Sequence, residues 1–237
     1  MYDAPVKVAL VTAASKGIGA AIARELAARG YQLALLARGP DVVELAAQLG
    51  GLAVTGSVTD GDALARLVDA ARARWQRIDL VVNNTGHPAK GDLLALPEAA
   101  WREGYELILE SAMRLARLVT PIMEAQGGGA FVHVSSYAAA EPELARPVSS
   151  VLRAALSAWV KLHAERGAPH GIRVNAVLPG FVDSYPIDEA TRARIPFGRA
   201  GSVGELARTV ASLASDDCAY VTGQCLLVDG GMLRGLR

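Results

Sequence analysis

The chain of 237 residues carries 24 Lys and Arg against 24 Asp and Glu, so its formal net charge is zero. It is 51% hydrophobic and 20% charged, which is typical of a globular protein and excludes a disordered one. This length fits one large domain, and a balanced charge without a basic stripe argues against nucleic acid or an anionic membrane as a partner.

Signals for export or membrane insertion are absent from the sequence. No apolar run reaches membrane-spanning length, and the N-terminus lacks the basic, apolar and cleavage regions of a signal peptide. Cys218 and Cys225 have no metal-ligand spacing to a histidine, and we expect two buried thiols in a reducing compartment. The sequence therefore predicts a cytoplasmic protein without a metal site.

Short apolar runs rich in Val, Leu and Ile predict strands that are buried on both faces. They lie at residues 6–12, 31–37, 51–56, 78–84, 129–135, 172–178 and 224–230. Helical spacing of apolar residues recurs between the runs, at residues 20–30, 61–75, 98–126 and 149–166. This alternation predicts a single doubly wound (Rossmann) α/β domain over residues 1–237, with a seven-stranded parallel sheet and helices on both faces. The irregular residues 184–201 follow the sixth strand and are predicted to cover the ligand-binding edge of the sheet.

The first predicted strand runs into a glycine-containing loop, TAASKGIG, and then into a helix. The start of a helix offers unpaired N–H groups and a partial positive charge, and glycines let the backbone approach a pyrophosphate closely. Gly17 and Gly19 are the two glycines in this position. A purely structural turn is the alternative, but a place after the first strand of an α/β chain favours a bound nucleotide.

The residue at the end of the second predicted strand indicates which nucleotide is bound. NAD-binding proteins usually place an acidic residue there, whereas this chain has Arg38. Ser15 and Lys16 in the loop are expected to converge on the same place. Two cations near the adenosine ribose favour a 2′-phosphate, and hence NADP(H) over NAD(H). The alternative is that Arg38 is a solvated charge at the end of a strand.

Several motifs in order give this chain a family resemblance. They are TAASKGIG (12–19), NNTG (83–86), FVHVSS (131–136), RVNAVLPGFVDS (173–184) and the segment from IPFGRAG to YVTGQCLLVDGG near the C-terminus. Over nearly its whole length the chain resembles the short-chain dehydrogenase/reductase family, especially its 3-oxoacyl-[acyl-carrier-protein] reductases. The resemblance implies a homodimer or homotetramer that pairs through the helices near 101–126 and 149–166 and through the C-terminal strand.

The same resemblance implies a set of cofactor contacts. They are Thr12, Ala14, Ser15, Lys16, Gly17, Ile18, Gly19, Arg38, Val58, Asn84, Thr85, Gly86, Arg153, Pro179, Gly180, Val182 and Ser184.

The family's chemistry rests on an asparagine, a serine, a tyrosine and a lysine, and this chain departs from that pattern. Ser136 matches the serine that orients the substrate carbonyl. Ser149 stands at the tyrosine position, Arg153 at the lysine position and Ile108 at the asparagine position. A serine hydroxyl is too weak an acid to replace the phenol, and arginine stays charged at any working pH.

Loss of the phenol does not exclude turnover. General acid catalysis contributes about 10²–10⁴-fold, while positioning a hydride donor against a carbonyl contributes about 7–11 kcal/mol. Water held by the active-site polar groups is one replacement for the phenol, and His87 and Tyr185 are two others. The alternatives are that His87 is an ordinary loop histidine and Tyr185 an ordinary residue of the covering segment. His133 is expected to be a hydrogen-bonded core histidine.

The leading hypothesis is an NADP(H)-dependent oxidoreductase that acts on a small carbonyl or alcohol substrate. Ser136 would orient the substrate oxygen, Ser149 would complete the hydrogen-bond network, and Arg153 would hold the ribose and stabilise negative charge. A nucleotide-binding partner or sensor with little catalysis is one alternative. A non-redox isomerase or cyclase on the same scaffold is the other.

Overall fold

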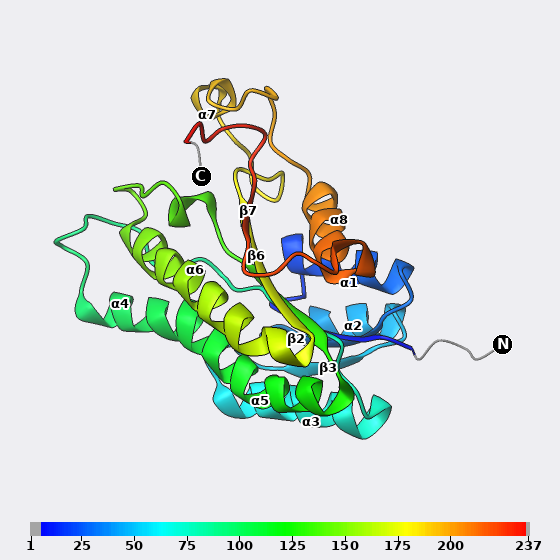
Figure 1. Ribbon diagram of the computed structural model, residues 1–237. Helices are drawn as coiled ribbons and strands as arrows, with labels where there is room; N and C mark the ends of the chain where they lie inside the picture. The colour runs from blue at the N-terminus through cyan, green and yellow to red at the C-terminus, as the bar shows by residue number, and fades with distance from the viewer. Residues whose placement is uncertain (1–5, 236–237) are drawn as a thin grey trace.

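A computed structural model describes residues 6–235. Its strands form one sheet in the order β3-β2-β1-β4-β5-β6-β7, and every pairing is parallel (Figure 1). The strands are β1 (Val8–Thr12), β2 (Gln32–Ala37), β3 (Leu52–Thr55), β4 (Leu80–Asn83), β5 (Gly129–Val134), β6 (Ile172–Pro179) and β7 (Cys225–Val228). The predicted seven-stranded doubly wound sheet is confirmed. Because β1 pairs with both β2 and β4, the strand order reverses there, which is where such sheets bind ligands.

Helices cover both faces of the sheet (Figure 1). They are α1 (Gly17–Ala28), α2 (Asp41–Gln48), α3 (Gly61–Trp75), α4 (Glu98–Tyr105), α5 (Ser111–Gln126), α6 (Pro147–Gly167), α7 (Glu189–Ala193) and α8 (Val203–Ala214). Apolar residues of α1, α2 and α8 pack on one face, and those of α3, α5 and α6 pack on the other. The helices α2, α7 and α8 were not among the predicted helical segments.

The predicted helix over 98–126 contains a break in its regular hydrogen bonding. A π-helical turn, Glu106–Glu110, joins α4 to α5. Its central residue, Ile108, is buried and packs with Ala112 and Leu156. Such turns often mark functional sites, because they re-aim the side chains of a helix. Ile108, at the position that the family resemblance assigns to an asparagine, therefore makes an apolar contact with α6.

The segment 184–201 leaves the carboxyl end of β6 and is anchored at both of its ends. Near its start, Val182 pairs with Gly201 as an isolated bridge. Near its far end, Ile195 packs with Tyr137 and Met232 in a small apolar cluster. The segment therefore lies at the carboxyl edge of the sheet, against the loop after β5 and the residues after β7.

Three further predictions concern single side chains and membrane insertion. Cys218 and Cys225 are free but half-buried, so the expectation of fully buried thiols was wrong. His133 is fully buried in β5 as expected, yet its Nε2 atom has no hydrogen-bond partner within residues 6–235. Among the helices of the described chain, none combines the length and apolar character that a membrane crossing requires.

Candidate functional site

The glycine loop is fixed to the NNTG segment by hydrogen bonds at the carboxyl ends of β1 and β4. The Thr12 hydroxyl donates to the Asn84 carbonyl oxygen at 2.7 Å and accepts from the Asn84 N–H at 3.0 Å. The Asn84 side chain donates to the Ala13 carbonyl oxygen at 3.2 Å. These contacts bring two predicted cofactor-binding segments together and hold the loop in one conformation.

The start of α1 has the features of an anion cradle. No side chain caps this helix, and its first turn holds no acidic residue. Gly17 lies in the left-handed region with φ +54°, and a Cβ there would lie 3.7 Å from the Cβ of Ser184. A Cβ at Gly19 would lie 2.2 Å from the Ala13 carbonyl oxygen and 2.8 Å from Asn84 Nδ2. The backbone here needs glycine for its close approach, and the open N–H groups fit the pyrophosphate of a dinucleotide.

Ala13 stands where the family loop has its first glycine, and its backbone is strained. Its φ is +47°, in the left-handed region that costs a residue with a Cβ roughly 1–2 kcal/mol. We therefore expect Ala13→Gly to stabilise the protein by about 1 kcal/mol, measured as the free energy of unfolding in urea. Gln76→Gly is the matched variant, because Gln76 has φ +60° at the end of α3, away from the loop. Loss of stability in Ala13→Gly alone would contradict this account of the strain.

Two cations beside the cradle have no partner among the residues that the structure describes. The Ala14 N–H donates to the Leu36 carbonyl oxygen at 3.1 Å, which sets the loop against the end of β2, where Arg38 follows. Lys16 and Arg38 are exposed, and neither side chain makes a hydrogen bond or ion pair within the described part of the chain. Both are therefore free to bind a phosphate. Val58, in contrast, buries its side chain in the core beside α3, which leaves only its backbone for a ligand.

Arg153 is a buried cation at the inner end of the site. It is 4% exposed, and its guanidinium donates to the Val134 carbonyl oxygen at 2.9 Å and to Thr85 Oγ1 at 3.4 Å. Its Nε–H has no partner, and no carboxylate of residues 6–235 lies within ion-pair distance. Burial lowers the pKa of Arg153 to about 10, so the group stays charged at neutral pH. An unpaired buried charge is costly, and an oxygen-rich or anionic ligand would offset that cost.

The two predicted active-site serines both keep a free hydroxyl hydrogen. Ser136 Oγ, after β5, accepts a hydrogen bond from the Ala138 N–H at 3.2 Å and can still donate. Ser149, in the first turn of α6, makes no side-chain hydrogen bond to the described residues. Its neighbour Ser150 is engaged instead, because it accepts from the Glu143 N–H at 3.0 Å. The hydrogen bond from Arg153 to Val134 ties α6 to the end of β5, and thus to Ser136.

The remaining predicted residues follow β4 and β6. Pro179 is buried at the end of β6, and the Gly180 N–H donates to the Val228 carbonyl oxygen at 3.0 Å. Gly86 and Ser184 are exposed, whereas Ile18 and Val182 are half-buried. The side chains of His87 and Tyr185 meet across this edge, with ring centroids 5.7 Å apart and an interplanar angle of 65°.

Sequence reasoning missed a charged cluster at the mouth of the site. Arg146 lies 5.9 Å from the Tyr137 ring centroid and 5.5 Å from that of Phe181, and it ion-pairs with Glu143 at 3.4 Å. Glu143 also ion-pairs with Arg194 of the covering segment at 3.6 Å. Glu143 and Arg146 are three residues apart, but no local spacing relates them to Phe181 or Arg194, so no sequence signal was available for the whole cluster. Burial is the main cause that raises the pKa of Tyr137, and Glu143 raises it further. The Tyr137 phenol is therefore a poor proton donor.

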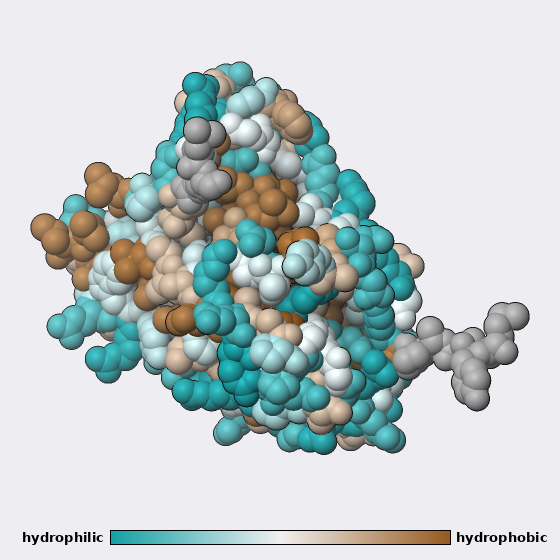
Figure 2. Space-filling model, viewed as in Figure 1, coloured by the Kyte–Doolittle hydropathy of each residue, from teal (hydrophilic) through white to brown (hydrophobic). Residues whose placement is uncertain are grey.

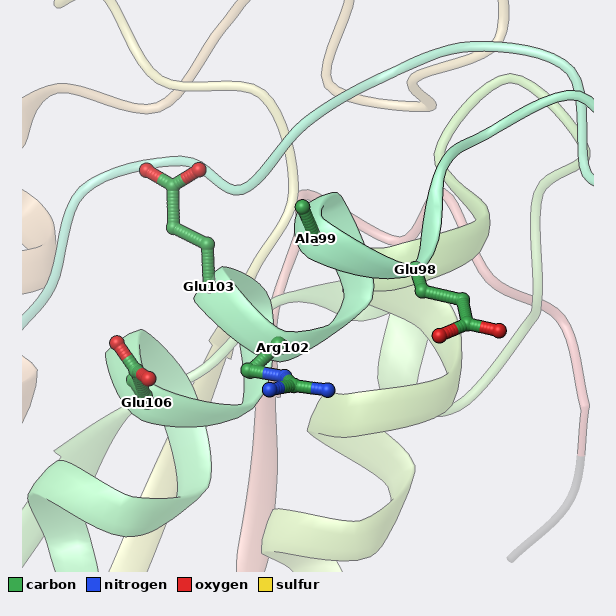
Figure 3. Close-up of a pocket in the computed structure, with 5 residues that line it drawn as sticks. All are labelled: Glu98, Ala99, Arg102, Glu103 and Glu106. Atoms are coloured by element: carbon green, nitrogen blue, oxygen red, sulfur yellow. The ribbon is translucent and has the colours of Figure 1, made fainter.

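A surface hollow on α4 and the start of the following π turn contains none of the predicted site residues. It is lined by Glu98, Ala99, Arg102, Glu103 and Glu106. Figure 3 shows that the Glu98 carboxylate points away from those of Glu103 and Glu106, with Arg102 between them. Within residues 6–235, no three His, Cys, Asp or Glu side chains are grouped so that they could hold a metal ion.

A family model described as enoyl-(acyl carrier protein) reductase matches residues 12–233, from the end of β1 to beyond β7. The chain belongs to the short-chain dehydrogenase/reductase family. The match covers the glycine loop, the NNTG segment and the turn after β6 together. The proposed resemblance is therefore confirmed, and with it membership of a family of oxidoreductases.

Characterised members of this family resemble the chain over almost its whole length. It is 33% identical to 3-oxoacyl-[acyl-carrier-protein] reductase FabG of Escherichia coli, with 95% of this chain and 97% of the relative covered. It is 39% identical to cis-4-hydroxycyclohexanecarboxylate dehydrogenase of Sinomonas cyclohexanicum, with 95% and 96% covered. The structure of L-sorbose reductase from Gluconobacter frateurii, complexed with NADPH and L-sorbose, superposes with a TM-score of 0.89 at 31% identity and 97% coverage of both chains.

Proposed function

We propose that this protein is an NADP(H)-dependent oxidoreductase that interconverts a carbonyl compound and its alcohol at an atypical active site. The observation that carries the proposal is the uncapped start of α1, where Gly19 closely approaches Ala13 and Asn84. The side chains of Lys16 and Arg38, which are unpaired within residues 6–235, favour a dinucleotide with a 2′-phosphate. The solved structure of a family member with NADPH is consistent with that choice.

The chain's own residues bind the substrate oxygen and stabilise the charge that develops on it. The bound dinucleotide supplies or takes up the hydride. Ser136 donates its free hydroxyl hydrogen to the substrate oxygen, and Ser149 offers a second hydroxyl from α6. Arg153 contributes a fixed positive charge that stabilises the ribose hydroxyls or a developing alkoxide, and its buried Nε–H is unpartnered within residues 6–235. Thr85 and Val134 orient that guanidinium through its two hydrogen bonds.

The substrate in this proposal has an apolar body. Loops after β4, β5 and the covering segment carry exposed apolar side chains at the carboxyl edge: Leu94 is 92% exposed, Leu144 81% and Phe197 73%. Figure 2 shows hydrophobic residues gathered at the left of the molecule, over the loops before α4 and α6. The segment 184–201 covers the bound substrate, and its ion pair from Arg194 to Glu143 holds it to the opposite loop.

Self-association through the helices α4, α5 and α6 and the strand β7 belongs to the same proposal. Tyr105, Val151 and Leu162 are exposed apolar residues on α4 and α6. The strand β7 forms an edge of the sheet and exposes Leu226. Analytical ultracentrifugation of the purified protein distinguishes the expected dimer or tetramer from a monomer.

The test measures binding and turnover separately. Calorimetry is expected to show that NADPH binds more tightly than NADH, and Arg38→Asp is expected to reduce that preference. A panel of ketones with increasing alkyl length is then reduced with NADPH, and KM is expected to fall as the chain lengthens. Tight NADPH binding without turnover of any substrate would instead favour the partner or sensor function. Product formation without cofactor consumption would favour an isomerase or cyclase.

A further inference from the structure

The proposed reaction needs a proton at the substrate oxygen, and the residues at the usual positions do not supply it. Ser149 is too weak an acid, and Arg153 stays charged at neutral pH. The buried side chain of Ile108 occupies the relay position with apolar contacts. The proton therefore comes either from water held by the polar groups of the site or from another side chain.

We propose that His87 gives and takes the proton at the substrate oxygen, and that Tyr185 is the residue that positions its ring. This inference rests on the proposed function above. The two rings, from loops far apart in the chain, meet at 5.7 Å in an edge-to-face arrangement that aromatic pairs favour.

Both residues directly follow segments that fit the dinucleotide. His87 comes after Gly86 in the NNTG segment, where Thr85 accepts a hydrogen bond from Arg153. Tyr185 comes after Ser184, whose Cβ lies 3.7 Å from the Cβ position of Gly17. Tyr185 is 60% exposed, and His87 also reaches solvent, so water can restore a proton that the imidazole has given up.

Charges around His87 set the direction in which it works best. Several causes lower the pKa of His87 below 6.5, and partial desolvation of the ring is the largest of them. The positive charges of Arg153 on α6, Lys90 in its own loop and Arg146 before α6 lower it further. The neutral imidazole therefore predominates at pH 7 and is ready to accept the proton of an alcohol. Reduction needs the imidazolium, so its rate is expected to rise as the pH falls through the lowered pKa.

The step balances as follows for reduction. A hydride from the reduced nicotinamide forms the new C–H bond at the carbonyl carbon, and the π electron pair of the C=O bond moves to oxygen. The imidazolium N–H bond of His87 breaks and its proton bonds to that oxygen. The dinucleotide is left oxidised, the carbonyl compound is reduced to an alcohol, and the neutral imidazole is reprotonated by hydronium or a buffer acid, so that one proton is consumed per turnover. Oxidation of the alcohol reverses each transfer.

The first test compares pH profiles of kcat and kcat/KM in both directions. His87→Gln is expected to lower kcat at least 100-fold and to flatten both profiles, and imidazole in the buffer is expected to restore part of the activity of His87→Ala. Tyr185→Phe keeps the ring and is expected to stay within a few fold of wild type. The control variants are His170→Gln and Tyr220→Phe, at exposed positions that belong to no part of the site.

The second test detects the contact between the His87 and Tyr185 rings without measuring turnover. In NMR spectra of protein labelled at histidine, the His87 resonance is identified by its loss in His87→Gln. Removing the aromatic ring in Tyr185→Leu is expected to shift that resonance through the lost ring current. An unshifted resonance would overturn the positioning role of Tyr185.

The outcomes separate this inference from the proposed function. Turnover by His87→Gln with an unchanged pH profile overturns the assignment of the proton donor and leaves the oxidoreductase standing. A large loss in Tyr185→Phe with full activity in His87→Gln also overturns it, because the phenol would then carry the proton. Failure of the wild type to turn over any substrate overturns both proposals.

Discussion

Gly19→Ala is expected to weaken NADPH binding by more than tenfold, which corresponds to about 1.4 kcal/mol or more. The added Cβ would lie 2.2 Å from the Ala13 carbonyl oxygen, a backbone atom, and 2.8 Å from Asn84 Nδ2. The backbone of the loop must then move, and Asn84 must give up its hydrogen bond to Ala13. Both changes displace the N–H groups that the pyrophosphate needs, while overpacking costs about 1–3 kcal/mol of stability. Calorimetry and thermal unfolding measure the two effects.

The matched control is Gly204→Ala in the first turn of α8. A Cβ there would lie 3.5 Å from the end of the flexible Arg208 side chain and 3.8 Å from Ser202 Oγ, both ordinary van der Waals distances, so stability and NADPH affinity are expected to stay near wild type or rise slightly. If Gly19→Ala lowered the melting temperature but kept the affinity for NADPH, the glycine loop would be a structural turn and not a phosphate cradle.

The fold could be predicted because its signals are local. The residues of β1 are buried throughout, which is why unbroken apolar runs marked the strands of the sheet. The helix α8 had a usable signal that the prediction did not apply: Ser202 and Glu205 form a reciprocal capping box, readable as Ser-x-x-Glu before an apolar run.

The chemistry of the site could be predicted only in part, because its contacts are not local. The resemblance located Arg153, but only the structure shows that its guanidinium has no acidic partner among residues 6–235 and is held by Thr85 and Val134. His87 and Tyr185 were separate candidates, and no spacing rule relates a residue after β4 to one after β6. The π turn at Glu106–Glu110 is likewise invisible to a periodicity argument, because its apolar residues continue the pattern of the helix.

Ser149→Tyr combined with Arg153→Lys is expected to raise kcat for simple ketones, and the gain is about 10²–10⁴-fold in a His87→Gln background, where no other side chain supplies the proton. The two positions lie four residues apart on α6, so their side chains share one face. Ser149 is half-buried and has no hydrogen bond to break within the described chain. A lysine ammonium in place of the guanidinium is a compact point charge that favours the ionised phenol, so the phenol becomes a stronger acid. Steady-state reduction with NADPH measures the gain.

Two control variants test the reason for the gain. Ser149→Phe with Arg153→Lys adds the same ring without the hydroxyl and is expected to show no gain. Ser149→Tyr alone leaves Arg153 bound to Val134 and Thr85, and is expected to gain less than the pair. No gain in the double variant would mean that the pocket above the serines has changed shape as well as chemistry.

The double variant also bears on the proton donor of the natural protein. If His87 supplies the proton in the wild type, a phenol at position 149 makes it dispensable. His87→Gln is then expected to cost at least 100-fold in the wild-type background but only a few fold in the double variant. Such dependence on background indicates that the two groups perform one task. For independent groups the changes in activation free energy would add, and His87→Gln would cost the same factor in both backgrounds. Equal losses in both backgrounds would mean that His87 supports the site in another way.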